Sequence, residues 1–142
     1  MSLRGLQNDL LELNDRIFRE TKFRTEQFAI NFVDFLVDES PVDTSNLISN
    51  YQVSVGTPAS DVVLPHVPGF AGSTRNASGT ITRLEAQFEL AGRRVGQTIF
   101  VTNNVDYLEA LNSNTQRSDN GFLERSFEMA IVKTESMPFR LT

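Results

Sequence analysis

The sequence predicts an α+β fold, in which a long N-terminal helix and further helices pack on a small, mainly antiparallel β-sheet. Apolar residues recur at steps of three and four from Leu3 onward, which indicates an amphipathic helix. Two short segments, residues 51–56 and 97–102, alternate apolar and polar side chains as half-buried strands do. The chain has 142 residues, so we expect a single domain over residues 1–142, with residues 1–39 as its helical N-terminal region.

The N-terminal helix is predicted to be unusually long for a domain of this size. Its apolar positions repeat first near the N-terminus and again around Phe28, Phe32 and Leu36. An unbroken helix over residues 3–38 would be about 54 Å long, whereas a compact domain of this size is roughly 35–40 Å across. The helix is therefore expected to bend near residues 21–25, to fold back as a hairpin, or to project beyond its domain. A projecting helix would leave a stripe that needs a partner: Leu3, Leu6, Leu10, Leu13 and Ile17.

A seven-residue corner, PVDTSNL at residues 41–47, is expected to set the angle between helix and sheet. Pro41 disfavours the α region at the residue before it, so the long helix should end near residue 40. Asp43 and Thr44 are candidates to cap one short helical turn over residues 45–49. Leu47 should pack beneath that turn.

The middle of the chain is predicted to hold a long flexible loop, residues 57–79, rich in proline and glycine. Within this loop Val62, Val63 and Leu64 are candidates for an edge strand. Irregular segments of this length are usually functional or disordered. A helix capped by Thr80 should follow, with Ile81, Leu84 and Phe88 on its apolar face.

The last third of the chain is predicted to hold two helices after the second strand. Asn103 and Asn104 end that strand with turn-forming side chains, and a short helix over residues 105–111 should turn Tyr107 inward. The terminal helix is expected over residues 121–136, beginning at Gly121 and Phe122. Residues 137–141 form either a tail strand or a loose end.

Catalytic chemistry finds little support in the sequence. His66 is the only histidine, and cysteine is absent, which excludes thiolate chemistry and disulfides. An exposed loop position is the simplest interpretation of His66. Asp34, Asp38 and Glu39 are most simply a solvated helix face, since no metal-ligand spacing accompanies them. We therefore expect no enzyme activity, no cofactor and no metal.

Composition also restricts the expected partners. The net charge is −5 and no basic cluster occurs, which argues against tight binding of nucleic acid through its phosphates. No apolar run approaches the roughly 20 residues of a membrane span, and no signal-peptide pattern is present.

Three motifs together resemble a known family. They are PVDTSNL at residues 41–47, IFVTNNVDY at residues 99–107 and TQRSDNGFL at residues 115–123. In this order they are similar to the tail-component, or tail-completion and neck, proteins of tailed bacteriophages. Members typically read PVDTG-x-L, so Ser45 stands where the family has glycine. Asn112 likewise stands where the family often has glutamate, and Arg117-Ser118 replaces Ala-Pro. The residues that carry the resemblance are Pro41, Asp43, Thr44, Leu47, Asn103, Asn104, Tyr107, Gly121 and Phe122.

The resemblance implies a structural virion protein located in the tail or neck. Such proteins form rings, often hexameric, at the head-proximal end of the tail tube, where they end tube growth or join the tail to the head connector. DNA would pass through the ring without specific binding. The candidate inter-subunit contacts are Leu3, Leu6, Leu10, Leu13, Val62, Val63, Leu64, His66 and Phe70. A non-enzymatic adaptor that dimerises through its N-terminal helix is the alternative.

Overall fold

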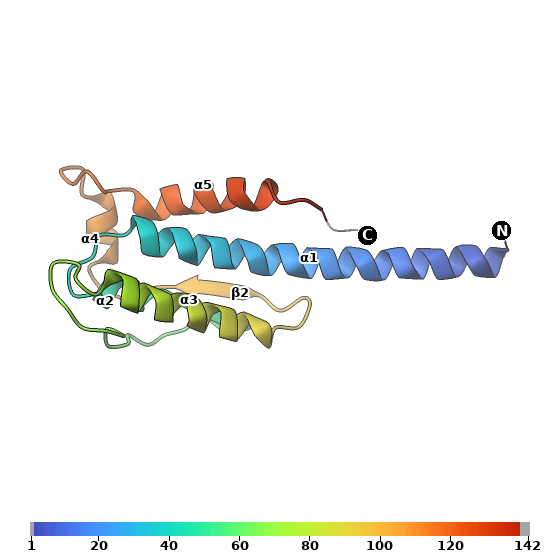
Figure 1. Ribbon diagram of the computed structural model, residues 1–142, viewed down its shortest axis with the longest axis horizontal. Helices are drawn as coiled ribbons and strands as arrows, with labels where there is room; N and C mark the ends of the chain where they lie inside the picture. The colour runs from blue at the N-terminus through green and yellow to red at the C-terminus, as the bar shows by residue number, and fades with distance from the viewer. Residues whose placement is uncertain (1, 140–142) are drawn as a thin grey trace.

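The computed structural model describes residues 2–139 and confirms the α+β class (Figure 1). Five helices and two strands follow one another, and the two strands pair antiparallel with Gln52 opposite Thr102 and Val55 opposite Ile99. The elements are α1 (Leu3–Glu39), α2 (Asn46–Ser49), β1 (Gln52–Val55), α3 (Arg75–Ala91), β2 (Ile99–Thr102), α4 (Leu108–Ser113) and α5 (Phe122–Glu135).

Helix α1 is a single unbroken helix of 37 residues, about 55 Å long at 1.5 Å per residue. The expected bend or hairpin near residues 21–25 is therefore wrong, and the projecting alternative is right. The N-terminal half of α1 extends well beyond every other element in Figure 1. The Ser2 hydroxyl caps this end by accepting a hydrogen bond from the Gly5 amide at 3.0 Å.

The C-terminal half of α1 is the centre of the fold, with α5 on one side and α3 and the sheet on the other (Figure 1). The sheet sends its odd-numbered residues toward α1 and α3, as the period of two requires. This main core joins Ala29, Val33 and Val37 of α1 to Val53 of β1, Ala86 and Leu90 of α3, and Ile99 and Val101 of β2.

Helix α3 begins at Arg75 and buries a face that differs from the predicted one. Leu84 is 58% exposed and Phe88 is 79% exposed, so the expected apolar face points outward. The buried face consists of Ser78, Gly79, Thr82, Ala86 and Leu90. Small residues are needed there because α3 lies very close to α1: a Cβ atom on Gly79 would lie 2.7 Å from Val37 Cγ1.

The remaining boundaries differ from the predictions in detail. The irregular segment covers residues 57–74, because α3 takes the last five residues of the predicted loop. It contains no strand at residues 62–64, where the Val63 amide and carbonyl bond to the Asn50 side chain instead of to a neighbouring strand. Tyr107 precedes α4 and is 38% exposed, so the inward orientation predicted for it is wrong. Beyond α5, Met137 and Phe139 contact Arg24 of α1, and residues 140–142 lie outside the described residues.

Candidate assembly surfaces

The PVDTSNL corner joins α1 to the long loop rather than only capping a turn. Thr44 Oγ1 accepts a hydrogen bond from the Asn46 amide at 3.4 Å, as expected of a cap. Asp43 instead accepts from the loop: its Oδ1 lies 2.6 Å from the Ala71 amide, and its carbonyl lies 3.0 Å from the Gly72 amide. The prediction that Asp43 caps α2 is therefore wrong, because its carboxylate is engaged across 28 residues of sequence.

Ser45 has a left-handed backbone conformation, with φ of 70°. This region favours glycine because a Cβ atom crowds the backbone there. The Ser45 hydroxyl makes a hydrogen bond of 2.7 Å with Thr74 Oγ1, just before α3. The corner is thus connected to α1, to the loop and to the start of α3.

The three motif segments converge on one cluster. Leu47, Val105 and Phe122 pack together as a small buried core, in which Phe122 is completely buried. Asn103 donates to the Leu47 carbonyl at 2.9 Å, and Asn46 donates to the Tyr107 hydroxyl at 2.9 Å. Segments 56 to 61 residues apart in the sequence are therefore joined directly by hydrogen bonds and form one structural unit. A shallow pocket of about 360 Å³ lies beside it, lined by Pro41, Val42, Asp43, Thr44, Asn46, Leu47, Tyr107, Leu111 and Arg117.

Asn112 fixes the start of α5. Its carbonyl accepts from the Gly121 amide at 2.7 Å, and its side-chain oxygen accepts from the Leu123 amide at 2.9 Å. Its amide group also donates to Glu124 and lowers the pKa of that carboxyl. Gly121 has a positive φ of 71° at this junction, which explains a glycine before Phe122.

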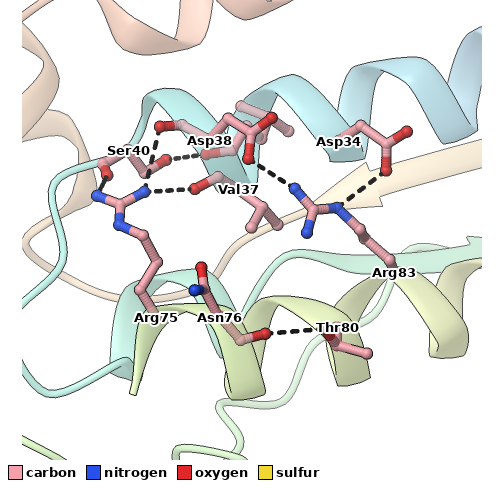
Figure 2. A network of polar contacts seen from close by, with 9 residues as sticks. Asp34, Val37, Asp38, Ser40, Arg75, Asn76, Thr80 and Arg83 are labelled. Carbon is pink, nitrogen blue, oxygen red and sulfur yellow. Dashed lines mark hydrogen bonds and ion pairs between the residues drawn. The ribbon is translucent and has the colours of Figure 1, made fainter. Parts of the chain in front are cut away.

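The C-terminal end of α1 is capped by an arginine from α3 (Figure 2). The Arg75 guanidinium donates to the carbonyls of Val37 at 2.9 Å, Asp38 at 3.1 Å and Ser40 at 2.7 Å. These carbonyls lie in the last turn, where helical partners are missing. The sequence does not predict this contact, because Arg75 is 35 residues from Ser40 and no local pattern indicates that the two are close.

The acidic cluster near the end of α1 is engaged in ion pairs. Arg83 binds Asp34 at 3.1 Å and Asp38 at 2.7 Å (Figure 2), and Arg125 binds Glu39 at 2.7 Å. Burial raises the pKa of Asp34 above its usual 3.8, although Arg83 acts in the opposite direction. These carboxylates therefore hold α3 and α5 against α1.

Asn50 is one of several residues that attach the loop over residues 57–74 to the body. This side chain is fully buried, donates to the Val63 carbonyl at 2.9 Å and accepts from the Val63 amide at 2.8 Å. Further along, the Ser78 hydroxyl exchanges hydrogen bonds with both the amide and the carbonyl of Val67. Just beyond the end of β2, Asn104 donates to the carbonyls of Ala59 and Asp61.

Only part of the predicted contact set in the loop faces solvent. Val62, Leu64 and Phe70 are exposed, and Leu64 is 86% exposed. Val63 is half-buried against the body. The His66 side chain is only 13% exposed, with Nε2 lying 3.4 Å from Glu85 of α3, so an exposed His66 is the wrong expectation. Leu64 and Phe70 are the loop residues best placed to contact another molecule.

The N-terminal half of α1 carries an uncovered apolar surface. All residues from 2 to 19 except Gly5 are exposed, and this surface includes five members of one stripe. This N-terminal stripe consists of Leu3, Leu6, Leu10, Leu13 and Ile17, which are 42–86% exposed. Such a surface on one helix indicates an interaction site.

A second exposed apolar surface lies between α3 and β1. Leu84 and Phe88 border a groove of about 590 Å³, whose floor includes Tyr51 and Val53. Burial raises the pKa of Tyr51, whose hydroxyl lies 2.6 Å from the Ser40 hydroxyl. Glu85 and Glu89 give this groove an acidic rim.

Within residues 2–139, no group of three or more His, Asp or Glu side chains is placed to hold a metal ion. None of the helices described there has the length and apolarity that crossing a membrane requires. Comparisons with protein-family models, curated proteins and solved structures find no match to this chain.

Proposed function

We propose that this chain is a structural protein of a bacteriophage tail or neck, assembling as a ring at the head-proximal end of the tail tube. In this role it ends tube growth or joins the tube to the head connector, and DNA passes through without specific binding. The proposal rests on the resemblance of three sequence motifs to tail-completion proteins.

The observation that carries the proposal is the convergence of those motifs in space. Leu47 of the first, Val105 of the second and Phe122 of the third share one buried cluster. A positive φ at Ser45 also supports the resemblance, because the similar proteins have glycine at this position. Motifs that form one structural unit are better explained by a shared fold than by chance matches to separate turns.

Exposed apolar surface supports a role in assembly. Leu64 and Phe70 of the loop and Leu84 and Phe88 of α3 are exposed apolar side chains on two different segments of the chain. A ring subunit needs at least two distinct surfaces, because head-to-tail contacts join different patches on neighbouring copies.

The test combines the purified chain with the tail-tube subunit of the same genome, followed by negative-stain imaging and native mass spectrometry. Rings, or tubes whose length becomes limited when the chain is added, are expected. A chain that never engages the tube contradicts the proposal. Leu64→Ser and Phe70→Ser should reduce engagement without affecting folding, whereas the half-buried Val63→Ser is the matched control for loss of stability.

The passage of DNA has its own test. The net charge of −5 supports a channel lined by acidic side chains, past which DNA moves without sticking. Tight, salt-sensitive DNA binding by the isolated chain would contradict this part of the proposal.

A non-enzymatic adaptor is the second candidate function, and the N-terminal stripe favours it. A stable dimer that ignores the tail tube would be the expected behaviour of such an adaptor.

A further inference from the structure

The N-terminal stripe of α1 lies on the same side of the helix as α5. At about 100° per residue, the five stripe residues point in nearly the same direction as the residues that contact α5. Arg24 donates to the Thr134 carbonyl at 2.9 Å, and Asn31 donates to Thr134 Oγ1 at 3.0 Å. Phe28 and Phe32 pack on Phe127. The stripe is therefore the uncovered continuation of a face on which a helix already lies.

The spacing of the stripe is that of a two-stranded coiled coil. Leu3, Leu6, Leu10, Leu13 and Ile17 alternate steps of three and four residues, which is the a/d pattern of paired helices. Farther along α1 the same pattern reaches Glu20 and Arg24, and Arg24 is occupied by the chain's own C-terminal segment at Met137. The space for a second helix thus ends near Glu20.

We propose that the N-terminal stripe binds the same stripe of a second copy of this chain, as an antiparallel helix pair. This inference goes beyond the ring, since the pair is isologous and closes on itself whereas ring contacts are head-to-tail. It depends only on α1 and holds for either proposed function.

Steric constraints select the antiparallel orientation. In a parallel pair, the second copy's α1 would continue past Ile17 and enter the space that α5 occupies over Arg24 and Phe28. In an antiparallel pair, the second helix ends near Glu20, just short of α5, and the second body lies beyond the N-terminus of the first. Figure 1 shows that no other element lies beside the N-terminal half of α1.

Charge selects the register. If Leu10 lies opposite the second copy's Leu13, then Leu6 lies opposite Ile17, and four aliphatic layers form by symmetry. In this register Asp9 of each copy flanks Arg16 of the other, which gives two opposite-charge pairs. A parallel pair in register would instead place Asp9 beside Asn14 and Arg16 beside Thr21, without any charge pair. Arg16 already lies 4.0 Å from Glu12 of its own helix, with 43% of its side chain exposed, so its charge remains accessible to a partner.

The first test is a matched pair of leucine variants studied by sedimentation velocity over a concentration series. Leu10 and Leu11 are neighbours and are 57% and 62% exposed, but only Leu10 belongs to the stripe. Leu10→Asp should weaken dimerisation at least ~100-fold, because two leucines are lost from the buried seam of each dimer. Leu11→Asp should leave the dimer intact. A wild-type chain that remains monomeric throughout, or equal losses in both variants, overturns the proposal.

The second test determines orientation and uses the absence of cysteine from the sequence. Under oxidation, Leu6→Cys mixed with Ile17→Cys should give a disulfide-linked heterodimer, whereas neither variant alone should link. In the antiparallel pair two copies of residue 6 are roughly 16 Å apart along the axis, beyond the ~7 Å Cα separation that a disulfide allows. Self-linking of Leu6→Cys would indicate a parallel pair and overturn the proposal.

The third test exchanges charges. Asp9→Arg alone should weaken the dimer roughly tenfold, because two attractive pairs become repulsive, and Asp9→Arg combined with Arg16→Asp should recover most of this loss. Failure of the double variant to recover affinity contradicts the register. Mixing the Leu10→Asp chain with the tail tube separates this proposal from the tail function. A chain that no longer pairs but still engages the tube normally would count against the adaptor alternative alone.

Discussion

Replacement of Arg75 by methionine should destabilise the fold far more than the same replacement of Arg83. Arg75 donates three hydrogen bonds to the last carbonyls of α1, and the bonds to Val37 and Ser40 are part-buried. A hydrogen bond from a charged donor contributes about 1.5 kcal/mol or more, and the Asp38 carbonyl can be rehydrated because its bond is exposed. The free energy of unfolding should therefore fall by ~2–4 kcal/mol in Arg75→Met.

Arg83→Met is the matched control, because it removes an arginine from the same helix that faces the same end of α1 (Figure 2). Its partners are the carboxylates of Asp34 and Asp38, 31% and 62% exposed. Pairs of this kind contribute about 0–1 kcal/mol. Urea unfolding followed by circular dichroism, at one protein concentration and with an unchanged m-value, measures both variants. Equal losses in the two variants would refute the role assigned to Arg75 as a cap.

Three further predictions concern the loop, the corner and pH. Asn50→Ala should destabilise the chain by ~2 kcal/mol and speed proteolysis within residues 57–74, because buried partners at Val63 lose their hydrogen bonds; Asn104→Ala, at an exposed position, should change both less. Ser45→Gly should be more stable than Ser45→Ala by about 1 kcal/mol, since both lose the bond to Thr74 but only glycine relieves the positive φ; equal stabilities in urea would contradict this. Burial raises the pKa of Asp34 above 3.8, so the folded chain binds more protons than the unfolded chain just above pH 3.8. Asp34 therefore makes stability fall as pH rises through this window, and Asp34→Asn should remove that contribution in a pH series of urea titrations; an unchanged slope would argue against it.

Local patterns in the sequence predicted most of the elements. The repeat from Leu3 to Ile17, the alternation in both strands and the glycine before Phe122 gave the helices and strands to within a few residues. The corner was placed correctly because Pro41 ends α1 by local backbone restriction.

Contacts between distant segments could not be predicted in this way. Helix α3 buries small and polar residues such as Ser78 and Gly79 because it lies close to Val37, and a search for large apolar side chains selects the opposite face. Asp43 looked like a local cap because its true partner, the Ala71 amide, lies 28 residues away. His66 is likewise partly buried beside Glu85 of α3, a residue 19 positions farther along the chain.

Helix α1 is packed in its C-terminal half and projects in its N-terminal half, and this difference determines how stable its helical structure is along its length. The C-terminal half is fixed by packing on both sides, so helical structure in the N-terminal half propagates outward from it, one hydrogen bond at a time, without a second nucleus. Each turn farther from the core is less stable than the one before it, and Gly5 weakens the first turn of α1 further. In a lone chain, protection of backbone amides from exchange should decline steadily from Glu20 toward Ser2. A partner helix would remove that gradient, so exchange of the backbone amides between Ser2 and Glu20 would report whether the chain is assembled.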